Sequence, residues 1–300
     1  MHIDTAKLRK FKDVFGNYLF ILPAIGMFLT FSLYPFAKVF QLSVFRWDGI
    51  SPVMNFVGLA NFKEILYDSV WWRAVWQAFY ITLLALVFQN ALALLLALFV
   101  DRGIRGGNVY RVIFYLPPVL SGIVVGLIWN WIYDGNYGLL NYLLEMLGLA
   151  HLQRAWLADP KTALTAIAVI HMWKGFGWGF VILLAGLQNI PRDLYEAADV
   201  DGAGSWEKFR HVTIPLMIPV FVMVSILTIL GTMQIFDIIV STTGGGPGYH
   251  TEVPVTRILA NMVGSSRFGY ACSQGIIFGL LLLFASLFQI RISRYLKQEQ

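Results

Sequence analysis

Six long apolar stretches constrain this chain more than any other feature of its sequence. They fall at residues 18–40, 76–100, 110–133, 163–187, 213–240 and 271–290. A helix needs roughly 20 apolar residues to cross a bilayer, and it satisfies its own backbone hydrogen bonds where lipid offers no partner. Only 13% of the residues are charged, about half the share in soluble domains. We therefore predict an all-α membrane protein with six transmembrane helices. This excludes a soluble enzyme, a disordered scaffold and a nucleic-acid-binding domain.

The first apolar stretch has the place of a signal peptide but not its length. Its apolar core continues well beyond the roughly 7–15 residues of such a peptide, and no small-x-small cleavage site follows closely. We expect a retained first span. The expected organisation is a cytoplasmic N-terminal tail at 1–17, the first helix and its outer loop at 18–70, a five-helix core at 71–290 and a cytoplasmic C-terminal tail at 291–300.

Lys and Arg residues are shared unequally between the two sides of the membrane. Thirteen lie in the two tails and in the connections between spans two and three and between spans four and five, and seven lie in the other connections. Cytoplasmic loops carry the excess of Lys and Arg. Both termini are therefore expected on the cytoplasmic side of the membrane.

The connection between spans four and five, at 188–212, holds the most informative residues. Pro191 suits the first turn of a helix, and Glu196 favours its positive end. Gly202 is expected to end this helix because glycine tolerates the left-handed conformation, and Ser205 to cap a second short helix. The result is a helix–glycine–helix elbow on the cytoplasmic face. It either packs on its own membrane domain or docks a cytoplasmic partner.

The elbow resembles the Glu-Ala-Ala loop of ATP-binding-cassette (ABC) importer permeases. In that loop Glu-Ala-Ala is followed after three residues by glycine and, nine residues later, by Ile-x-Leu-Pro. Here the sequence reads Glu196-Ala197-Ala198, then Gly202, then Val212-x-Ile214-Pro215. Val212 and Ile214 replace the usual Ile and Leu and keep their apolar bulk.

Segments outside the elbow narrow the resemblance to the carbohydrate-uptake branch of these permeases. They are Leu187-Gln-Asn-Ile-Pro191 and Thr242-Thr-Gly-Gly-Gly-Pro247. Three further segments resemble the first of the two permease subunits, which is related to the maltose and glycerol-3-phosphate permeases: Leu22-Pro23, Tyr34-Pro35 and Val57-Gly-Leu-Ala-Asn-Phe62.

This resemblance implies a type I ABC importer permease fold in a bacterial or archaeal cytoplasmic membrane. It also implies that substrate passage and ATP hydrolysis belong to different subunits. The elbow would insert into a groove on a separate ATPase subunit, present as a dimer, through the coupling residues Glu196, Ala197, Ala198, Asp201, Gly202 and Pro215. A second homologous permease and an extracellular solute-binding protein would complete the system, which would import a carbohydrate by alternating access. The chain has no Gly-x-x-x-x-Gly-Lys-Ser/Thr loop. We therefore expect no enzyme activity and no bound cofactor in this chain, with ATP and Mg on the partner ATPase.

Polar residues in the middle of spans four and five form the candidate substrate path. The expected members are His171, Lys174, Gly175 and Trp178 on span four, and Ser225, Thr228 and Thr232 on span five. Lys174 and Thr228 lie roughly 18 and 21 Å from the inner ends of their helices, so the two faces should meet at one depth. Donors and acceptors beside an aromatic ring suit a sugar, and the equivalent spans line the sugar path in the maltose permease that the chain resembles. The alternative is that these groups hold packed helices together.

Asp237 is expected near the outer end of span five, roughly 35 Å from its inner end. An ion pair with Lys174 would need a broken helix, so we expect Asp237 to shape the outer mouth together with Gly245, Gly246 and Pro247. Further polar residues in the spans could line the path, although the sequence does not rank them: Gln89, Asn90, Asn130 and Gln274.

Functions of two other classes are open at this stage. A six-helix channel or an ion-coupled secondary carrier would work without ATP, but a carrier needs intramembrane carboxylates and the spans offer essentially only Asp237. A membrane-embedded enzyme would need convergent catalytic or metal-ligating groups. The lone Cys272 fits no disulfide or metal pattern. Within the importer reading, glycerol-3-phosphate or another polar solute is an alternative to a carbohydrate. The sequence does not decide which carbohydrate, which of the two permeases holds the substrate site, which ATPase, or which type of cell envelope.

Overall fold

The computed structural model describes residue 18 and residues 20–298, with side chains up to residue 291. The predicted N-terminal tail at 1–17 lies outside the described residues. Two compact units make up the chain: one joins the residues up to Tyr67 with Ala260–Ile277, and the other joins Asp68–Leu259 with the residues from Phe278. The predicted division into a first span and a five-helix core stays a prediction.

Five helices in the described part of the chain are long and apolar enough to cross a membrane. They are Phe20–Ser43, Ser69–Asp101, Ala163–Gln188, Ser205–Thr242 and Phe268–Arg291. A sixth candidate is the pair Gly107–Val119 and Gly122–Ile132, bent by 96°. The six predicted spans are therefore found. The expectation that the third, at 110–133, is one continuous helix is wrong.

The first unit combines the first span with a small hairpin. Asn61 is buried in α3, and its side-chain amide donates to the carbonyls of Ser43 and Phe45 at 2.8 and 3.0 Å, which ties α3 to the end of the span. Arg267 and Glu64 pair at 2.7 Å. The elements are the π-turn Leu29–Leu33, α2 (Tyr34–Ser43), β1 (Phe45–Arg46) antiparallel to β2 (Asn55–Phe56), α3 (Ala60–Tyr67), the π-turn Ala260–Gly264 and the start of α15 (Phe268–Gln298).

The second unit holds the remaining helices. Its first span is α4 (Ser69–Leu84), the π-turn Ala85–Gln89 and α5 (Asn90–Asp101); the bent pair α6 (Gly107–Val119) and α7 (Gly122–Ile132) follows. Then come α8 (Leu139–Met146), the 3₁₀ turn Ala150–Leu152, α9 (Ala163–Gln188), α10 (Arg192–Val200), α11 (Ser205–Lys208), the π-turn Phe209–Thr213, α12 (Ile214–Met233), α13 (Asp237–Thr242) and α14 (Pro254–Leu259).

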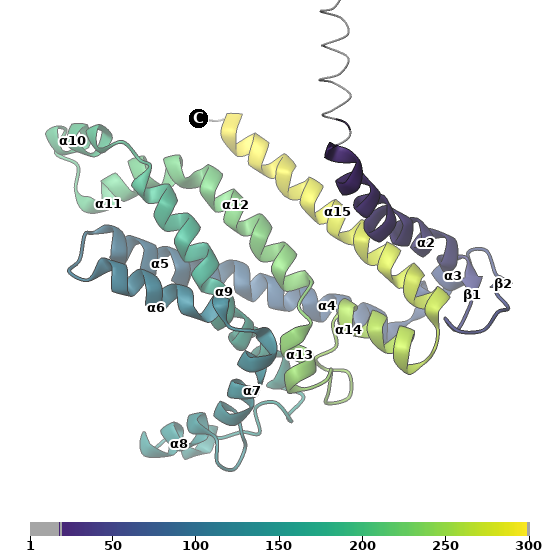
Figure 1. Ribbon diagram of the computed structural model, residues 1–300. Helices are drawn as coiled ribbons and strands as arrows, with labels where there is room; N and C mark the ends of the chain where they lie inside the picture. Colours follow the sequence, from purple (N-terminus) through teal and green to yellow (C-terminus); the bar gives the residue numbers. More distant parts are fainter. Residues whose placement is uncertain (1–17, 19, 299–300) are drawn as a thin grey trace, which may run out of the picture. The chain divides into compact units, whose positions relative to one another are not determined.

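Helix α9 is the central element of the second unit, packed against α5, α6 and α12 (Figure 1). It contributes to two separate apolar clusters. Ile167 and Ile170 of its first half pack in one cluster with residues of α7 and α13. Phe180 and Leu183 of its second half pack in the other with residues of α5 and α12. The segment between these clusters, 171–178, carries the polar residues that the sequence placed in mid-membrane.

Two adjacent prolines lie just before the bend of the third span. Pro117 and Pro118 have no backbone N–H, so the carbonyls four residues earlier, in Ile113 and Phe114, lose their helical donors. Helix α6 ends at Val119, and α7 begins at Gly122. The freed carbonyl of Phe114 lies against Gly177 of α9, where any Cβ would overlap it. The prolines therefore lie where α6 packs closely on Gly177 of α9.

The fifth span is also broken, although no proline or glycine marks the site. Helix α12 ends at Met233, and α13 begins at Asp237 and packs on α7. The Asp237 carboxylate accepts from the backbone N–H of Ile238 at 2.9 Å and lies against Gly122, where a Cβ would overlap it. It thus sits at the first residues of both α13 and α7, where a negative charge is favourable. The span expected at 213–240 is thus found within Ser205–Thr242, with an interruption at residues 234–236.

Residues 134–156, which we name the α8 excursion, form an ordered connection between α7 and α9. Asn141 is buried at its centre: its side-chain nitrogen donates to the carbonyls of Gly135 and Arg154 at 3.0 and 2.9 Å, and its side-chain oxygen accepts from Trp156 Nε1 at 2.8 Å. Backbone N–H groups of Asn136 and Tyr137 hold the pKa of the Asp134 carboxyl below its usual range. Such satisfied hydrogen bonds give this loop a defined shape.

Candidate functional site

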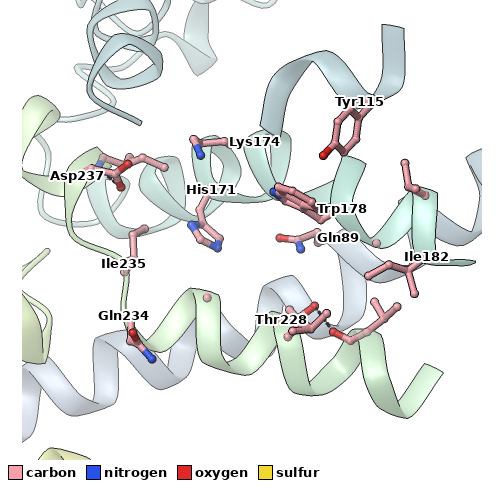
Figure 2. Close-up of a pocket in the computed structure, with 17 residues that line it drawn as sticks. Gln89, Tyr115, His171, Lys174, Trp178, Ile182, Thr228, Gln234, Ile235 and Asp237 are labelled. Carbon is pink, nitrogen blue, oxygen red and sulfur yellow. Dashed lines mark hydrogen bonds between the residues drawn. The ribbon is translucent and has the colours of Figure 1, made fainter. Parts of the chain in front are cut away.

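A cavity of about 610 Å³ lies in the second unit, beside the segment of α9 that separates the two apolar clusters. This volume is typical of small-molecule sites. Figure 2 shows Tyr115 and Trp178 toward one end, Asp237 toward the other, and His171 and Lys174 between them. The lining comprises Gln89, Tyr115, His171, Lys174, Gly175, Trp178, Gly179, Val181, Ile182, Val224, Leu227, Thr228, Gly231, Gln234, Ile235, Asp237 and Ile238.

Aromatic side chains form one wall of the cavity. The rings of Tyr115 and Trp178 meet edge to face, with centroids 5.3 Å apart and planes at 84°. Trp178 is 55% exposed, so one surface of its indole is free for contact. An exposed aromatic face beside polar groups suits a ligand that is apolar on one side and polar on the other.

Charged and polar side chains line other parts of the cavity wall. Lys174 and His171 come from α9, Asp237 comes from the start of α13, and no ion pair joins Lys174 to Asp237 among the described residues. The broken fifth span brings Asp237 into the lining of the same cavity as Lys174, although the expected absence of a direct ion pair holds among the described residues. A role of Asp237 in an outer mouth stays a prediction.

The structure assigns the predicted residues of span five to different surroundings. Thr228 lines the cavity, but its hydroxyl is already bonded to Asn90 Oδ1 at 3.0 Å and to the Val224 carbonyl at 2.9 Å. Thr232 is fully buried outside the lining and bonds Thr82 at 2.8 Å. Ser225 is half-buried and outside the lining. For Thr232 the geometry matches the helix-packing alternative.

Sequence reasoning named Gln89 without ranking it, and missed Tyr115 and Gln234. The structure places all three in the lining. The other unranked residues serve packing: Asn90 bonds Thr228, Asn130 donates to the Ser241 carbonyl at 2.8 Å, and Gln274 of the first unit accepts from Asn261 at 2.9 Å. A polar residue inside a span was the available signal, and it does not tell a ligand contact from a contact between helices.

The elbow is the second candidate site, and its turn is closed by glycine. Helix α10 ends in two bonds, from the N–H of Gly202 to the Asp199 carbonyl at 3.1 Å and from the N–H of Ala203 to the Ala198 carbonyl at 2.9 Å. This is the pattern of a Schellman stop. Gly202 has φ +77°, as its predicted role requires.

Three further contacts fix the elbow. The Gly204 N–H donates to the Glu207 carboxylate at 2.6 Å, so Gly204 caps α11 in place of Ser205, which was the predicted cap. Lys208 pairs with Asp199 at 2.6 Å and joins α11 to α10. Tyr195 bonds Thr213 at 2.9 Å and holds α10 against the start of the fifth span. Helix α11 runs through a π-turn into α12, so it is the beginning of that span.

The elbow carries apolar side chains that are exposed. Leu194 is 42% exposed, Val200 88% and Trp206 68%. Tyr195 and Lys208 thus fix α10, while the apolar side chains of Leu194 and Ala197 on this helix remain exposed. An apolar surface on a fixed helix is typical of an interaction site.

The residues expected at an outer mouth form a hydrogen-bonded loop. Gly245 has φ +94°, and Thr251 Oγ1 donates to the Gly246 carbonyl. Gln77 of α4 donates to the Tyr249 carbonyl at 3.0 Å and ties the loop to the second span. Gly245, Gly246 and Pro247 do not line the cavity.

Comparison with known proteins decides the family. Residues 89–298 match the model of the binding-protein-dependent transport system inner membrane component. The chain belongs to this family. The probable ABC transporter permease protein YurN of Bacillus subtilis is 34% identical over 94% of this chain and 97% of its own. The trehalose/maltose transport system permease protein MalF of Thermococcus litoralis is 32% identical over 97% of both chains.

A solved structure supports the fold independently. A chain from the crystal structure of a bacterial ABC transporter involved in the import of alginate superposes with a TM-score of 0.84 at 23% identity. The match covers 97% of this permease and 99% of that chain. Together with the family match, this confirms the predicted type I ABC importer permease fold.

Proposed function

We propose that this chain is a permease subunit of an ABC importer that moves a carbohydrate across the cytoplasmic membrane by alternating access. The observation that carries the proposal is relatedness along nearly the whole chain to sugar permeases. Besides the trehalose/maltose permease, the AraP permease of the arabinooligosaccharide system of Bacillus subtilis is 31% identical over 99% of this chain. The aromatic and polar lining of the cavity suits such a substrate.

The transporter would contain three further kinds of subunit. The family is defined by dependence on a binding protein, and an alginate importer of the same fold has been solved in complex with a periplasmic protein that carries an alginate pentasaccharide. A second permease and an ATPase dimer would complete the assembly. ATP and Mg belong to that ATPase, because the sequence of this chain has no phosphate-binding loop.

The elbow would transmit ATPase closure to the membrane helices. Its assigned residues are Glu196, Ala197, Ala198, Asp201, Gly202 and Pro215. Support comes from the exposed apolar side chains of α10 and α11 and from the direct continuation of α11 into α12. A movement imposed on the elbow would reach the cavity through α12, which contributes Thr228 and Gly231 to the lining.

The cavity is assigned as the part of the substrate path contributed by this chain. His171, Lys174, Gly175, Trp178 and Thr228 would face the substrate, whereas Ser225 and Thr232 would serve helix packing. The Lys and Arg distribution supports both termini on the cytoplasmic side, with Asp237 and the Gly245–Pro247 loop toward the outside.

The test is gentle purification of this chain from its native membranes, with mass spectrometry of the copurified chains and reconstitution into proteoliposomes. Uptake of tritiated maltose, trehalose, arabinotriose and glycerol 3-phosphate would be measured with and without ATP and the copurified binding protein. A second permease, an ATPase and ATP-dependent sugar uptake are expected. Uptake of glycerol 3-phosphate alone would overturn the carbohydrate assignment. Solute flux without ATP from a chain purified alone would favour a channel or a secondary carrier.

A further inference from the structure

We propose that Gln89 is a specificity-determining residue, whose side-chain amide recognises two neighbouring hydroxyl groups on a sugar ring. The proposal rests on the carbohydrate import proposed above. It extends that function to span two, and it names the chemical feature of the substrate that is recognised. Four observations on the second unit carry it.

The first is an unused hydrogen-bonding group. Gln89 is 5% exposed, lines the cavity, and its Oε1 has no partner. A buried carbonyl without a hydrogen-bond donor is unfavourable, so each such group calls for an explanation. Other buried polar atoms in the described chain also lack partners, but among these residues only Gln89 lines the cavity.

The second is the local backbone. Gln89 is the last residue of the π-turn Ala85–Gln89, and the N–H of Asn90 donates to the Ala85 carbonyl five residues earlier. One-turn π-bulges occur frequently at functional sites, because the added residue reorients the side chains that follow. Asn90 in turn accepts from Thr228 at 3.0 Å, which fixes this turn against α12.

The third is the residue that faces the amide. Gly175 of α9 leaves room for Gln89: a Cβ on residue 175 would lie 2.7 Å from Gln89 Oε1 and 2.9 Å from Nε2. Glycine in a helix interior is less favourable than alanine. Here it allows an amide from another helix to reach the polar face of α9 between His171 and Trp178.

The fourth is the match between an amide and a sugar. A glutamine amide presents an acceptor and a donor side by side, and two hydroxyls on adjacent ring carbons offer the complementary pair. Trp178 and Tyr115 line the same end of the cavity as Gln89 (Figure 2) and supply an apolar wall for the ring face. A sugar ring with a vicinal diol therefore fits this end better than an acyclic polyol phosphate.

The experiment uses the complete transporter in proteoliposomes. The probes are the sugar that enters fastest among tritiated maltose, trehalose and arabinotriose, and the monodeoxy analogues of that sugar. In the wild type, removal of one of the two recognised hydroxyls should lower the uptake rate about tenfold, as expected for loss of one or two hydrogen bonds. Gln89→Leu should take up the parent sugar about tenfold more slowly and no longer distinguish it from that analogue.

Gly175→Ala tests the same contact without changing the amide. The added methyl should displace the flexible end of Gln89 and reproduce the loss of discrimination. In a Gln89→Ala background, where no amide remains to be displaced, Gly175→Ala should cause no further loss of discrimination between the parent sugar and its analogue. Val87→Ala, on the exposed side of the same π-turn, is the matched control and should transport like the wild type.

A melting temperature at least as high as that of the wild type is expected for Gln89→Leu, because the substitution removes an unpaired buried oxygen. Sugar uptake by Gln89→Leu at the wild-type rate, with the analogues still distinguished, would overturn this inference and leave carbohydrate import intact. A wild type that takes up only glycerol 3-phosphate would overturn both.

Discussion

Gly202 joins a motif in the sequence to a backbone conformation in the structure. The Glu-Ala-Ala spacing predicts a glycine turn after α10, and the residue has φ +77° at a Schellman stop. No atom lies within 4 Å of the position where a Cβ would stand. The requirement for glycine therefore comes from the backbone angle and not from crowding.

Gly202→Val should leave membrane insertion intact and abolish ATP-dependent uptake. A β-branched residue in the left-handed region costs about 1–2 kcal/mol or more, so α10 would leave the elbow at another angle. Uptake and the amount of copurified ATPase are the measurements. Gly204→Ala is the control, since Gly204 has φ −69° and space for a methyl group. Normal uptake by Gly202→Val would remove the elbow from the coupling path.

Trp178→Ala should lower sugar uptake about fivefold without weakening association with the ATPase. The substitution removes roughly 1 kcal/mol of aromatic contact with the substrate and lies far along α9 from the elbow. Uptake rate and copurification report the two effects separately. Trp131→Ala removes an 83% exposed ring outside the cavity and should change neither. Equal effects of the two substitutions would return Trp178 to a packing role.

The spacing of side chains along a helix correctly predicted which residues lie on one face. It did not predict which neighbours that face contacts. His171, Lys174 and Trp178 do line one cavity. Thr228 and Thr232 are also one helical turn apart, as Lys174 and Trp178 are. However, Thr228 lines the cavity, whereas Thr232 bonds Thr82. The neighbour of a polar residue is set by the crossing of two helices, which a single sequence does not contain.

Among the secondary-structure elements, the breaks in the third and fifth spans were not predicted from the sequence. Prolines are tolerated in transmembrane helices because neighbouring groups satisfy the freed carbonyls, so Pro117 and Pro118 do not by themselves specify a 96° bend. The break at residues 234–236 has no proline or glycine at all. Its consequence is large, because it places Asp237 at the start of α7 and in the cavity with Lys174.

Asn141→Ala should loosen the α8 excursion without affecting the transmembrane helices. The substitution removes hydrogen bonds to Gly135, Arg154 and Trp156, with a local cost of about 2 kcal/mol or more because the partners stay buried. Hydrogen exchange over residues 134–156 should speed up about 30-fold or more. Asn136→Ala, which removes an exposed amide, is the matched control. Unchanged exchange in Asn141→Ala would show that this loop is held by other contacts.

For the whole molecule, the sequence predicted the number of spans and the family, and the orientation can be tested directly. With Cys272 replaced by Ser, a cysteine at Ser205→Cys should react with a membrane-impermeant maleimide only in inside-out vesicles, and one at Asn136→Cys only in right-side-out vesicles or spheroplasts. Both positions are exposed. Cys272 itself is 5% exposed, so the parent chain should label weakly. The opposite labelling pattern would reverse the proposed topology.

The arrangement of α9 has a consequence for how such permeases diversify. Its two apolar clusters hold neighbouring helices together, while His171, Lys174 and Trp178, which lie between the clusters, line the cavity. Substitutions at these three positions and at the facing Gln89 leave both clusters unchanged. Relatives at 30–32% identity are named for trehalose/maltose, arabinooligosaccharides and glycerol-3-phosphate. One ancestral scaffold could thus acquire new cargo through a handful of mutations, with its apolar clusters untouched.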